Sequence, residues 1–282
     1  MEIFTRIDAL RQYLDAHKET GGPISFVPTM GALHKGHLSL IEQAKLNGGL
    51  VICSIFVNPT QFTDPKDLEK YPRPLEHDIN LLNTVGCNAV FMPSVEEMYP
   101  LWPEKEEWHI DLGETEFLLE GAFRKGHYQG VTQIVKKLFD AVQPNFAYFG
   151  QKDYQQILMI EKMVSFFQLN IEIVSCPIIR EEDGLAMSSR NIHLTERDRK
   201  SALILFAALN FVKANYGKLT PSALISEASK MVNTEIGVEL EYLSIADRKT
   251  LIPVKDDYKG KAVALIAAKV GNTRLIDNVL LD

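Results

Sequence analysis

Short apolar runs that alternate with helical patterns limit the fold of this chain more than any other feature of its sequence. The runs lie at residues 24–28, 50–57, 88–92, 145–149 and 171–176, with a weaker strand pattern near residues 108–112. A run without polar alternation is typical of a strand covered on both faces, as in parallel sheets with β-α-β connections. Helical spacing lies between the runs, most clearly over residues 128–142. The sequence therefore predicts an α/β domain built on a doubly wound parallel sheet.

The pattern changes in the last hundred residues. A long helix is expected after Thr195, a suitable N-cap, and a second helix starts with Pro221 in a first-turn position. Strand-like segments follow at residues 239–245, 262–270 and 273–280. Their alternation fits a small antiparallel sheet. We therefore expect a first domain at residues 1–176 and a second, smaller α+β domain at residues 177–282.

A histidine-containing turn follows the first apolar run. The strand is expected to break at Pro28, and a helical pattern occupies residues 37–46. Between them lie two glycines and two histidines, Gly31, Gly36, His34 and His37. Open α/β sheets bind their ligands beyond the carboxyl ends of their strands. The two imidazoles are therefore expected to face a ligand.

The residues alone leave three interpretations of His34 and His37. Histidines three apart can share a metal ion, but such a site needs a third ligand, and the sequence identifies none. They can also be solvated residues of an ordinary turn. In the third interpretation, Gly31 and Gly36 let the backbone approach a ligand, and a helix N-terminus at His37 offers N–H groups to a phosphate. We favour phosphate binding, because the strand end, the glycines and the helix start coincide.

Composition and cysteine usage exclude several other classes of protein. A net charge of −7 over 282 residues argues against nucleic acid as a partner, and a polyanion would have to bind at a local cluster. No segment approaches the roughly 18 uncharged residues of a membrane span, and the N-terminus has no apolar stretch of signal-peptide length. Cys53, Cys87 and Cys176 lack CxxC spacing, which disfavours zinc and suits a reducing compartment. A cytoplasmic protein with no nucleic-acid or membrane partner is expected.

Further polar segments are candidates to complete a phosphate site, since the chain contains neither a P-loop nor a dinucleotide fingerprint. Residues 150–156 follow a strand, with Lys152 suited to a phosphate and Asp153 equally suited to cap the next helix. Residues 184–191 offer two hydroxyls and a guanidinium, but such a segment can also be a polar linker. Gln61 follows another strand and is either a loop residue or a donor and acceptor for a polar substrate.

Six motifs stand in order along the first two thirds of the chain. They are PTMGALHKGH at residues 28–37, FVNPTQF at 56–62, YPR at 71–73, FRKGH at 123–127, FGQKDYQQ at 149–156 and DGLAMSSRN at 183–191. Together they resemble the pantoate–β-alanine ligase family. The HxGH element at residues 34–37 also resembles the HIGH signature of the wider nucleotidyltransferase superfamily, and residues 187–190 stand where that superfamily has its mobile KMSKS loop. Six ordered motifs are far more specific than a lone HxGH.

The resemblance implies a Rossmann-like, HIGH-type nucleotidyltransferase domain and a two-step ligation. The carboxylate of pantoate attacks the α-phosphate of ATP to give pantoyl adenylate and pyrophosphate, and the amine of β-alanine then displaces AMP. Mg2+ that bridges phosphate oxygens fits this reaction, because it neutralises charge without a dedicated protein cage. ATP, pantoate and β-alanine are then the small-molecule partners, and a homodimer is the assembly expected from the family.

The resemblance also implies roles for individual residues. The ATP-binding set is Met30, Gly31, Ala32, Leu33, His34, Lys35, Gly36, His37, Gly150, Gln151, Lys152, Asp153, Ile179, Met187, Ser188, Ser189 and Arg190. Gln61 and Gln156 bind pantoate, and Gln61 is also near β-alanine. The family describes His37 as proton donor, whereas we expect both histidines to stabilise charge at the phosphates. The catalytic set is His34, His37, Lys152, Ser188, Ser189 and Arg190.

One segment departs from the family pattern. Pro74 stands where the family usually has Thr, and Glu76, His77 and Asp78 stand in place of a later acidic pair. Asp78 matches the second acid and is expected to contact Mg2+ through water, while His77 has no assigned role. These residues follow a long polar connection at residues 58–74, of the kind that is often functional.

Two other functions compete with ligation. A different nucleotidyltransferase of the same superfamily would retain the nucleotide in its product, and its ATP–pyrophosphate exchange would not need pantoate. A catalytically silent adenine-nucleotide sensor would bind ATP but release neither AMP nor pyrophosphate. Both alternatives retain the sheet and the glycines, so only the reaction products separate them from a ligase.

Overall fold

The computed structural model describes residues 1–62, 65–104 and 106–282. Contacts within the chain divide it into two compact units. The first contains Met1–Gly150 and Gln155–Pro177, and the second contains Gln151–Tyr154 and Ile178–Asp282. Each unit has its own sheet and its own hydrophobic core. The short segment Gln151–Tyr154 therefore belongs with the C-terminal part of the chain.

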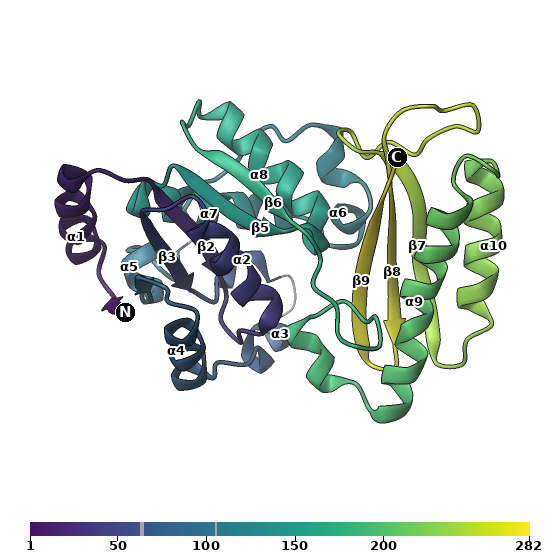
Figure 1. Cartoon of the computed structure of the whole chain (residues 1–282), viewed down its shortest axis with the longest axis horizontal. Helices are drawn as coiled ribbons and strands as arrows, with labels where there is room; N and C mark the ends of the chain where they lie inside the picture. Colours follow the sequence, from purple (N-terminus) through teal and green to yellow (C-terminus); the bar gives the residue numbers. More distant parts are fainter. Residues whose placement is uncertain (63–64, 105) are drawn as a thin grey trace. The chain divides into compact units, whose positions relative to one another are not determined.

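A six-stranded parallel sheet forms the centre of the first unit (Figure 1). Its strands are β1 (Glu2–Phe4), β2 (Ile24–Thr29), β3 (Leu50–Ile55), β4 (Ala89–Phe91), β5 (Phe146–Gly150) and β6 (Glu172–Cys176), in the order β1-β4-β3-β2-β5-β6. Five of the six were predicted from their apolar runs. The sixth, β1, has only three residues, two of them exposed, so it carries no run that could reveal it.

The strand order places a topological switch point between β2 and β5. From β2 the chain continues to β3 and β4 on one side, and β5 and β6 pair on the other side. Ligands of open α/β sheets bind in the crevice at the carboxyl ends of the strands beside such a point. The carboxyl ends of β2 and β5 are Thr29 and Gly150, so the histidine-containing turn directly follows this position.

Helices cover both faces of this sheet. On one face α1 (Ile7–Thr20), α7 (His127–Val142) and α8 (Tyr154–Phe166) pack with strand residues such as Phe26 and Ile52. On the other face α2 (Lys35–Lys45) and α4 (Leu75–Thr84) pack with Val27 and Cys53. Successive strand residues thus enter different cores, which explains the apolar runs without polar alternation. The doubly wound α/β fold is confirmed.

The remaining helical turns of the first unit are η1 (Pro59–Gln61), α3 (Pro65–Lys70), α5 (Val95–Met98), η2 (Glu114–Phe117) and α6 (Glu120–Phe123).

Two local predictions were wrong. The helix expected at residues 37–46 begins two residues earlier, at Lys35, because His34 provides its N-cap. No strand forms at residues 108–112 in the described chain. There the side chain of Gln129 replaces a partner strand: it accepts the N–H of Ile110 at 3.1 Å and donates to its carbonyl at 3.0 Å. Trp108, Ile110 and Leu112 still point toward the core, which is what made the segment resemble a strand.

The second unit packs two helices against a three-stranded antiparallel sheet. Its main elements are α9 (Glu196–Asn215), α10 (Pro221–Asn233), β7 (Val238–Asp247), β8 (Ala262–Val270) and β9 (Thr273–Leu281), with sheet order β7-β8-β9. Both helix starts were predicted correctly: Thr195 accepts the N–H of Asp198 at 3.1 Å, and Pro221 is the first residue of α10. The antiparallel sheet and the smaller α+β fold are confirmed.

Two further observations concern helices and thiols. None of the helices within the described residues is both long and apolar enough to cross a membrane. Cys53, Cys87 and Cys176 are free and buried. Burial raises the pKa of each of these thiols.

Candidate functional site

The side chains of the two histidines in the turn after β2 each accept a backbone N–H of the same turn. His34 Nδ1 accepts the N–H of Gly36 at 3.1 Å, and His37 Nδ1 accepts the N–H of His34 at 3.3 Å, which together form a capping box at the start of α2. The two rings lie with their centroids 4.1 Å apart. A ring nitrogen that accepts an N–H carries no proton, so the proton of each neutral imidazole resides on Nε2. The turn thus holds two N–H donors in fixed orientations.

The same bonds change what the helix start can offer a ligand. The N–H of Gly36 donates to His34 Nδ1, and the N–H of His37 donates to the carbonyl of His34 at 2.8 Å. The prediction that His37 begins the helix and exposes its amide was therefore wrong. At these positions the imidazole Nε2–H groups, rather than helix amides, are the donors suited to a phosphate.

A buried carboxylate from α4 holds the backbone of this turn. Asp78 is 1% exposed, and its two oxygens accept the N–H groups of Ala32 and Leu33, each at 2.8 Å. Burial raises the pKa of Asp78, and the two amide bonds act in the opposite direction. Gly31 has a φ of +81°, and a Cβ there would lie 3.0 Å from Asp78 Oδ2. The turn therefore needs both a glycine at position 31 and an acceptor at position 78.

These contacts bear on the predicted magnesium contact of Asp78. Mg2+ is usually bound by one or two carboxylates together with phosphate oxygens and water. Within the described residues, no group of three or more His, Cys, Asp or Glu side chains is placed to hold a metal ion. The oxygens of Asp78 already bind backbone amides. The magnesium role of Asp78 stays a prediction.

Gln61 is the last residue of η1, and its side chain is fixed at both ends. Its Nε2 donates to the sulfur of Met30 at 2.9 Å, and its Oε1 accepts from Asn58 Nδ2 at 3.2 Å. The structure thus brings together the segments after β2 and β3. Asn58 is buried, donates to the carbonyl of Gly130 at 3.1 Å and accepts from Tyr99 Oη at 2.8 Å.

Gly130 on α7 allows η1 to pack closely. A Cβ at this position would lie 2.6 Å from the carbonyl oxygen of Thr60, so only glycine fits. The ring of His127 also contacts the carbonyl of Gln61, at 2.9 Å. Sequence reasoning assigned no role to Asn58, Tyr99 or Gly130. Asn58 stands within a recognised motif, whereas Tyr99 and Gly130 have no local sequence signal.

Two neighbouring glutamines of α8 have different environments. Gln155 is buried and binds backbone groups around α6, donating to the carbonyls of Thr115 and Leu118 at 2.7 and 2.8 Å and accepting from Glu120. Gln156 is half-buried, and in the described chain its side chain forms no hydrogen bond. Gln155 is therefore a structural anchor, whereas the side chain of Gln156 is not engaged by any described residue. The structure does not join Gln156 to Gln61 directly.

In the second unit, residues 179–187 form a short hairpin that leads into η4 (Ser189–His193). The N–H of Met187 donates to the carbonyl of Ile179 at 3.0 Å, and Arg180 and Ala186 form an isolated bridge. Ser188 caps η4 by accepting the N–H of Arg190 at 3.3 Å. The side chains of Ser189 and Arg190 are half-buried and make no hydrogen bond or ion pair with any described residue. The hairpin thus joins Ile179 to Met187, and η4, which follows it, carries the hydroxyl of Ser189 and the guanidinium of Arg190.

The segment after β5 also belongs to the second unit. It forms η3 (Gln151–Asp153), whose backbone is bound by Asn278 of β9. Lys152 is half-buried, and its ammonium group has no hydrogen-bond partner among the residues that the structure describes. Asp153 is exposed, and its carboxylate accepts no backbone N–H of a helix in the described chain. The alternative interpretation of Asp153 as a helix cap therefore has no support.

Comparison with known proteins gives the context for this geometry. The family model described as pantoate-beta-alanine ligase matches residues 2–280. The chain belongs to this family. Two curated pantothenate synthetases, from Acetivibrio thermocellus and Carboxydothermus hydrogenoformans, are 42% and 46% identical to it. The matches cover all of this chain, and 100% and 99% of the two relatives.

Solved structures of the pantoate–β-alanine ligase family agree with the fold. A pantothenate synthetase from Thermus thermophilus has a TM-score of 0.91 at 40% identity, with 99% of each chain covered. A pantoate-beta-alanine ligase from Francisella tularensis, complexed with beta-gamma ATP and beta-alanine, has a TM-score of 0.82 at 34% identity, with 99% of this chain and 97% of that chain covered. The family motifs at residues 28–37, 56–62 and 149–156 lie at the carboxyl ends of β2, β3 and β5, which are neighbours in the sheet of the first unit.

Proposed function

We propose that this chain condenses pantoate with β-alanine to give pantothenate, at the expense of ATP. A carboxylate oxygen of pantoate attacks the α-phosphorus of ATP, and the bond from that phosphorus to the bridging oxygen breaks, so pyrophosphate leaves. The amine of β-alanine then attacks the carbonyl carbon of the adenylate. The bond to AMP breaks, and the amine loses a proton. Family membership and the arrangement of the motifs at three neighbouring strand ends support this reaction.

The histidine-containing turn is proposed to stabilise the charge that develops when pyrophosphate leaves. His34 and His37 each hold a proton on Nε2, because their Nδ1 atoms accept backbone N–H groups. Donors that are oriented before the reaction need no reorganisation as charge builds up. We therefore assign the two histidines as neutral hydrogen-bond donors to phosphate oxygens. Proton transfer by His37 is not required, since pyrophosphate is a weakly basic leaving group.

Pantoate is proposed to bind Gln61 and Gln156, and β-alanine to approach Gln61. The contact of Gln61 with Met30 is the observation that carries this assignment, because it places an amide beside the turn that is proposed to hold ATP. The side chain of Gln61 is already oriented by Asn58. The side-chain amide of Gln156 forms no hydrogen bond with a described residue, so it can donate to and accept from a hydroxy acid.

The remaining residues of the predicted set are proposed to bind ATP. Lys152, Ser188, Ser189 and Arg190 offer an ammonium group, two hydroxyls and a guanidinium, which suit phosphate oxygens. Ile179 is proposed to lie near the adenine. Mg2+ would neutralise charge on the phosphate oxygens. The described residues contain no group of three or more ligands dedicated to such an ion. The domain at residues 1–176 is proposed to be catalytic, with the KMSKS-like segment at the start of the domain at residues 177–282.

Assembly and location are also proposals. We propose the homodimer that the family resemblance implies, which light scattering on the purified chain would test. The three free, buried thiols suit the reducing cytoplasm.

The decisive experiment is an assay for AMP and pyrophosphate with ATP, pantoate and β-alanine, each omitted in turn. Pyrophosphate exchange into ATP should require pantoate but not β-alanine, and AMP should accumulate only with all three. Exchange that needs no pantoate would favour a different nucleotidyltransferase. ATP binding without release of AMP or pyrophosphate would favour a nucleotide sensor.

A further inference from the structure

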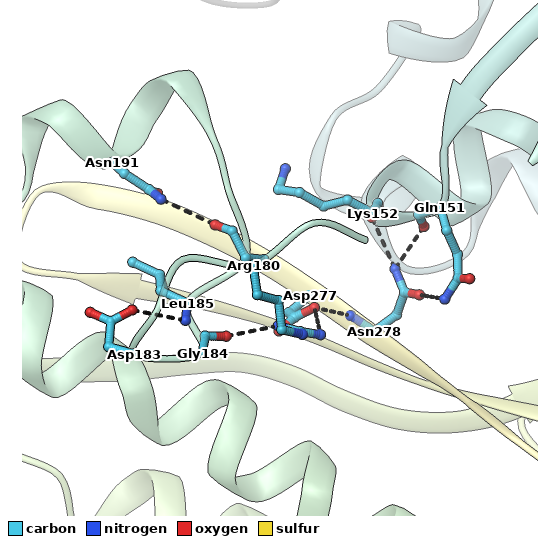
Figure 2. A network of polar contacts seen from close by, with 10 residues as sticks. Gln151, Lys152, Arg180, Asp183, Gly184, Leu185, Asn191, Asp277 and Asn278 are labelled. Carbon is cyan, nitrogen blue, oxygen red and sulfur yellow. Dashed lines mark hydrogen bonds and ion pairs between the residues drawn. The ribbon is translucent and has the colours of Figure 1, made fainter. Parts of the chain in front are cut away.

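Two adjacent polar residues of β9, Asp277 and Asn278, lie buried in a strand that otherwise supplies the core of the second unit. They are 5% and 2% exposed, whereas their neighbours Leu275, Val279 and Leu281 pack in the hydrophobic core. Burying a carboxylate or an amide costs free energy unless hydrogen bonds compensate it. Both side chains are fully engaged, and each binds a segment that we propose to contact ATP (Figure 2).

Asp277 binds the base of the hairpin that leads to residues 187–190. Its two oxygens pair with Arg180, with Nη1 at 2.6 Å from Oδ2 and Nη2 at 2.9 Å from Oδ1. Arg180 Nη1 also donates to the carbonyl of Gly184 at 3.1 Å, across the turn of the same hairpin. The guanidinium lies 3.8 Å from the centre of the Phe206 ring on α9. Asp277 and Phe206 therefore fix Arg180, and Arg180 fixes the hairpin.

Gly184 shows that this arrangement is built closely. Its φ is +94°, and a Cβ there would lie 2.6 Å from the ring of Phe206. Only glycine lets the hairpin turn reach the ring on which Arg180 stacks. Asn191 closes the other side of the hairpin by donating to the carbonyl of Ala186 at 3.1 Å and to Glu181 at 2.8 Å.

Asn278 binds the backbone of the segment after β5. Its Nδ2 donates to the carbonyls of Gln151 and Lys152 at 2.9 and 3.0 Å, and its Oδ1 accepts from Gln151 Nε2 at 3.1 Å. Both amide protons and the amide oxygen are thus used on η3. The N–H of Asn278 donates to Asp277 Oδ1 at 2.8 Å, which connects the two branches seen in Figure 2.

We infer that Asp277 and Asn278 are positioning residues for ATP: they hold the Gln151–Lys152 backbone and the hairpin before residues 187–190 on one strand. This inference rests on the proposed ATP-binding role of those segments. The two segments are far apart in sequence but share β9 as their support. Lys152, Ser189 and Arg190 carry side chains without partners in the described chain, so their reach depends on the backbone that β9 fixes.

Asn278→Asp and Asp277→Asn test this inference with nearly unchanged side-chain volume. Asn278→Asp removes both donors and turns a carboxylate toward two carbonyl oxygens, which should release η3. Asp277→Asn weakens the bidentate pair with Arg180. Each variant should raise the dissociation constant of MgATP in calorimetry, and the KM for ATP, by about tenfold, the loss of roughly one strong hydrogen bond. The KM values for pantoate and β-alanine should stay within about twofold, a split that a general loss of structure would not produce.

Glu241→Gln is the matched control. It weakens the half-buried ion pair between Glu241 of β7 and Arg274, 2.8 Å long, and Glu241 lies outside both ATP segments in the sequence. It should leave MgATP binding unchanged. Circular dichroism and thermal unfolding check the fold of each variant, and Asn278→Ala, which adds no buried charge, replaces Asn278→Asp if the latter does not fold.

The outcomes separate this inference from the proposed function. A folded Asn278 variant with an unaltered MgATP dissociation constant would overturn the positioning role. Weaker MgATP binding in the variants, with a wild-type chain that makes no AMP, would support positioning and reject ligation. A wild-type chain that binds no MgATP would reject both.

Discussion

The two segments that we propose to bind the phosphates of ATP are held in different ways. In the turn at residues 30–37, Asp78 binds two backbone amides, and both imidazoles accept further N–H groups. Residues 187–190 follow the hairpin at residues 179–187, and within the described chain their hydrogen bonds are made by the backbone and by the hydroxyl of Ser188, which accepts the N–H of Arg190. The side chains of Ser189 and Arg190 contact no polar partner in the described chain.

This difference separates two tasks. Donors whose orientation is fixed in advance stabilise developing charge without reorganisation, and that is the task we assign to the histidines. Side chains without partners can change rotamer when a ligand arrives, which suits residues that close over bound phosphates. Substitutions in the turn should therefore affect the chemical step, and substitutions at residues 188–190 should affect affinity for ATP.

The largest effect is expected for His37→Ala. It removes one oriented donor, so pantoate-dependent ATP–pyrophosphate exchange should fall about 10²- to 10³-fold, as for other preorganised donors. The KM for ATP should change far less. His109→Ala, at an exposed histidine outside the motifs, is the control. Exchange at the wild-type rate in H37A would remove His37 from the catalytic set.

A smaller effect of another kind is expected for Arg190→Ala. Loss of a guanidinium–phosphate contact should raise the KM for ATP about 10- to 100-fold. Thermal stability should stay unchanged, because no described residue bonds to this side chain. Arg197→Ala, at an exposed arginine of α9, is the control. A marked loss of stability in R190A would show that this segment is held as firmly as the histidine turn, and the comparison would fail.

The sequence predicts the sheet of the first unit well, because burial on both faces produces runs that are visible locally. β1 was missed because an edge strand of three residues, Glu2–Phe4, needs no such run. The strand expected near residue 110 was wrong because Gln129 satisfies that backbone from a helix, which no spacing rule describes.

The candidate site was predictable where motifs follow strand ends and not where contacts are distant. His34, His37 and Gln61 were proposed from strand ends and the family motifs, and the structure brings Gln61 to Met30 in the histidine-containing turn. Asp78 was predicted to contact magnesium, which stays a prediction, whereas its bonds to Ala32 and Leu33 appear only in the fold. Asp277 and Asn278 were not found, since their partners lie 97 and 127 residues away and β9 has the sequence of an ordinary core strand.

The next effect tests the two glutamines that we propose to bind pantoate, of which only Gln61 has a side chain that bonds to other described residues. Gln61→Ala and Gln156→Ala should each raise the KM for pantoate about tenfold, the loss of a neutral hydrogen bond, with little change for ATP. Only Gln61→Ala should also lower the melting temperature, because Gln61 bonds to Met30 and Asn58. Equal losses of ATP and pantoate affinity would show that the pocket is misassigned.

The smallest effect concerns how firmly Asp78 holds the histidine turn. Burial raises the pKa of Asp78 above its ordinary value of 3.8, against the opposing effect of the Leu33 and Ala32 amides. The folded chain therefore binds this proton more tightly than the unfolded chain does. The contribution of Asp78 to stability is greatest below pH 3.8 and is lost as the pH rises through the raised pKa.

Asp78→Asn does not titrate, so it isolates this contribution. The free energy of unfolding of both proteins is measured with urea at a series of pH values. As the pH rises across this window, the wild type should become less stable relative to Asp78→Asn. Groups that titrate elsewhere cancel in the difference. If the wild type instead became more stable relative to Asp78→Asn as the pH rises, the two amide bonds would outweigh the cost of burying the carboxylate. The ionised carboxylate would then stabilise the turn. The difference in how firmly the histidine turn and residues 187–190 are held would be larger than the raised pKa of Asp78 implies.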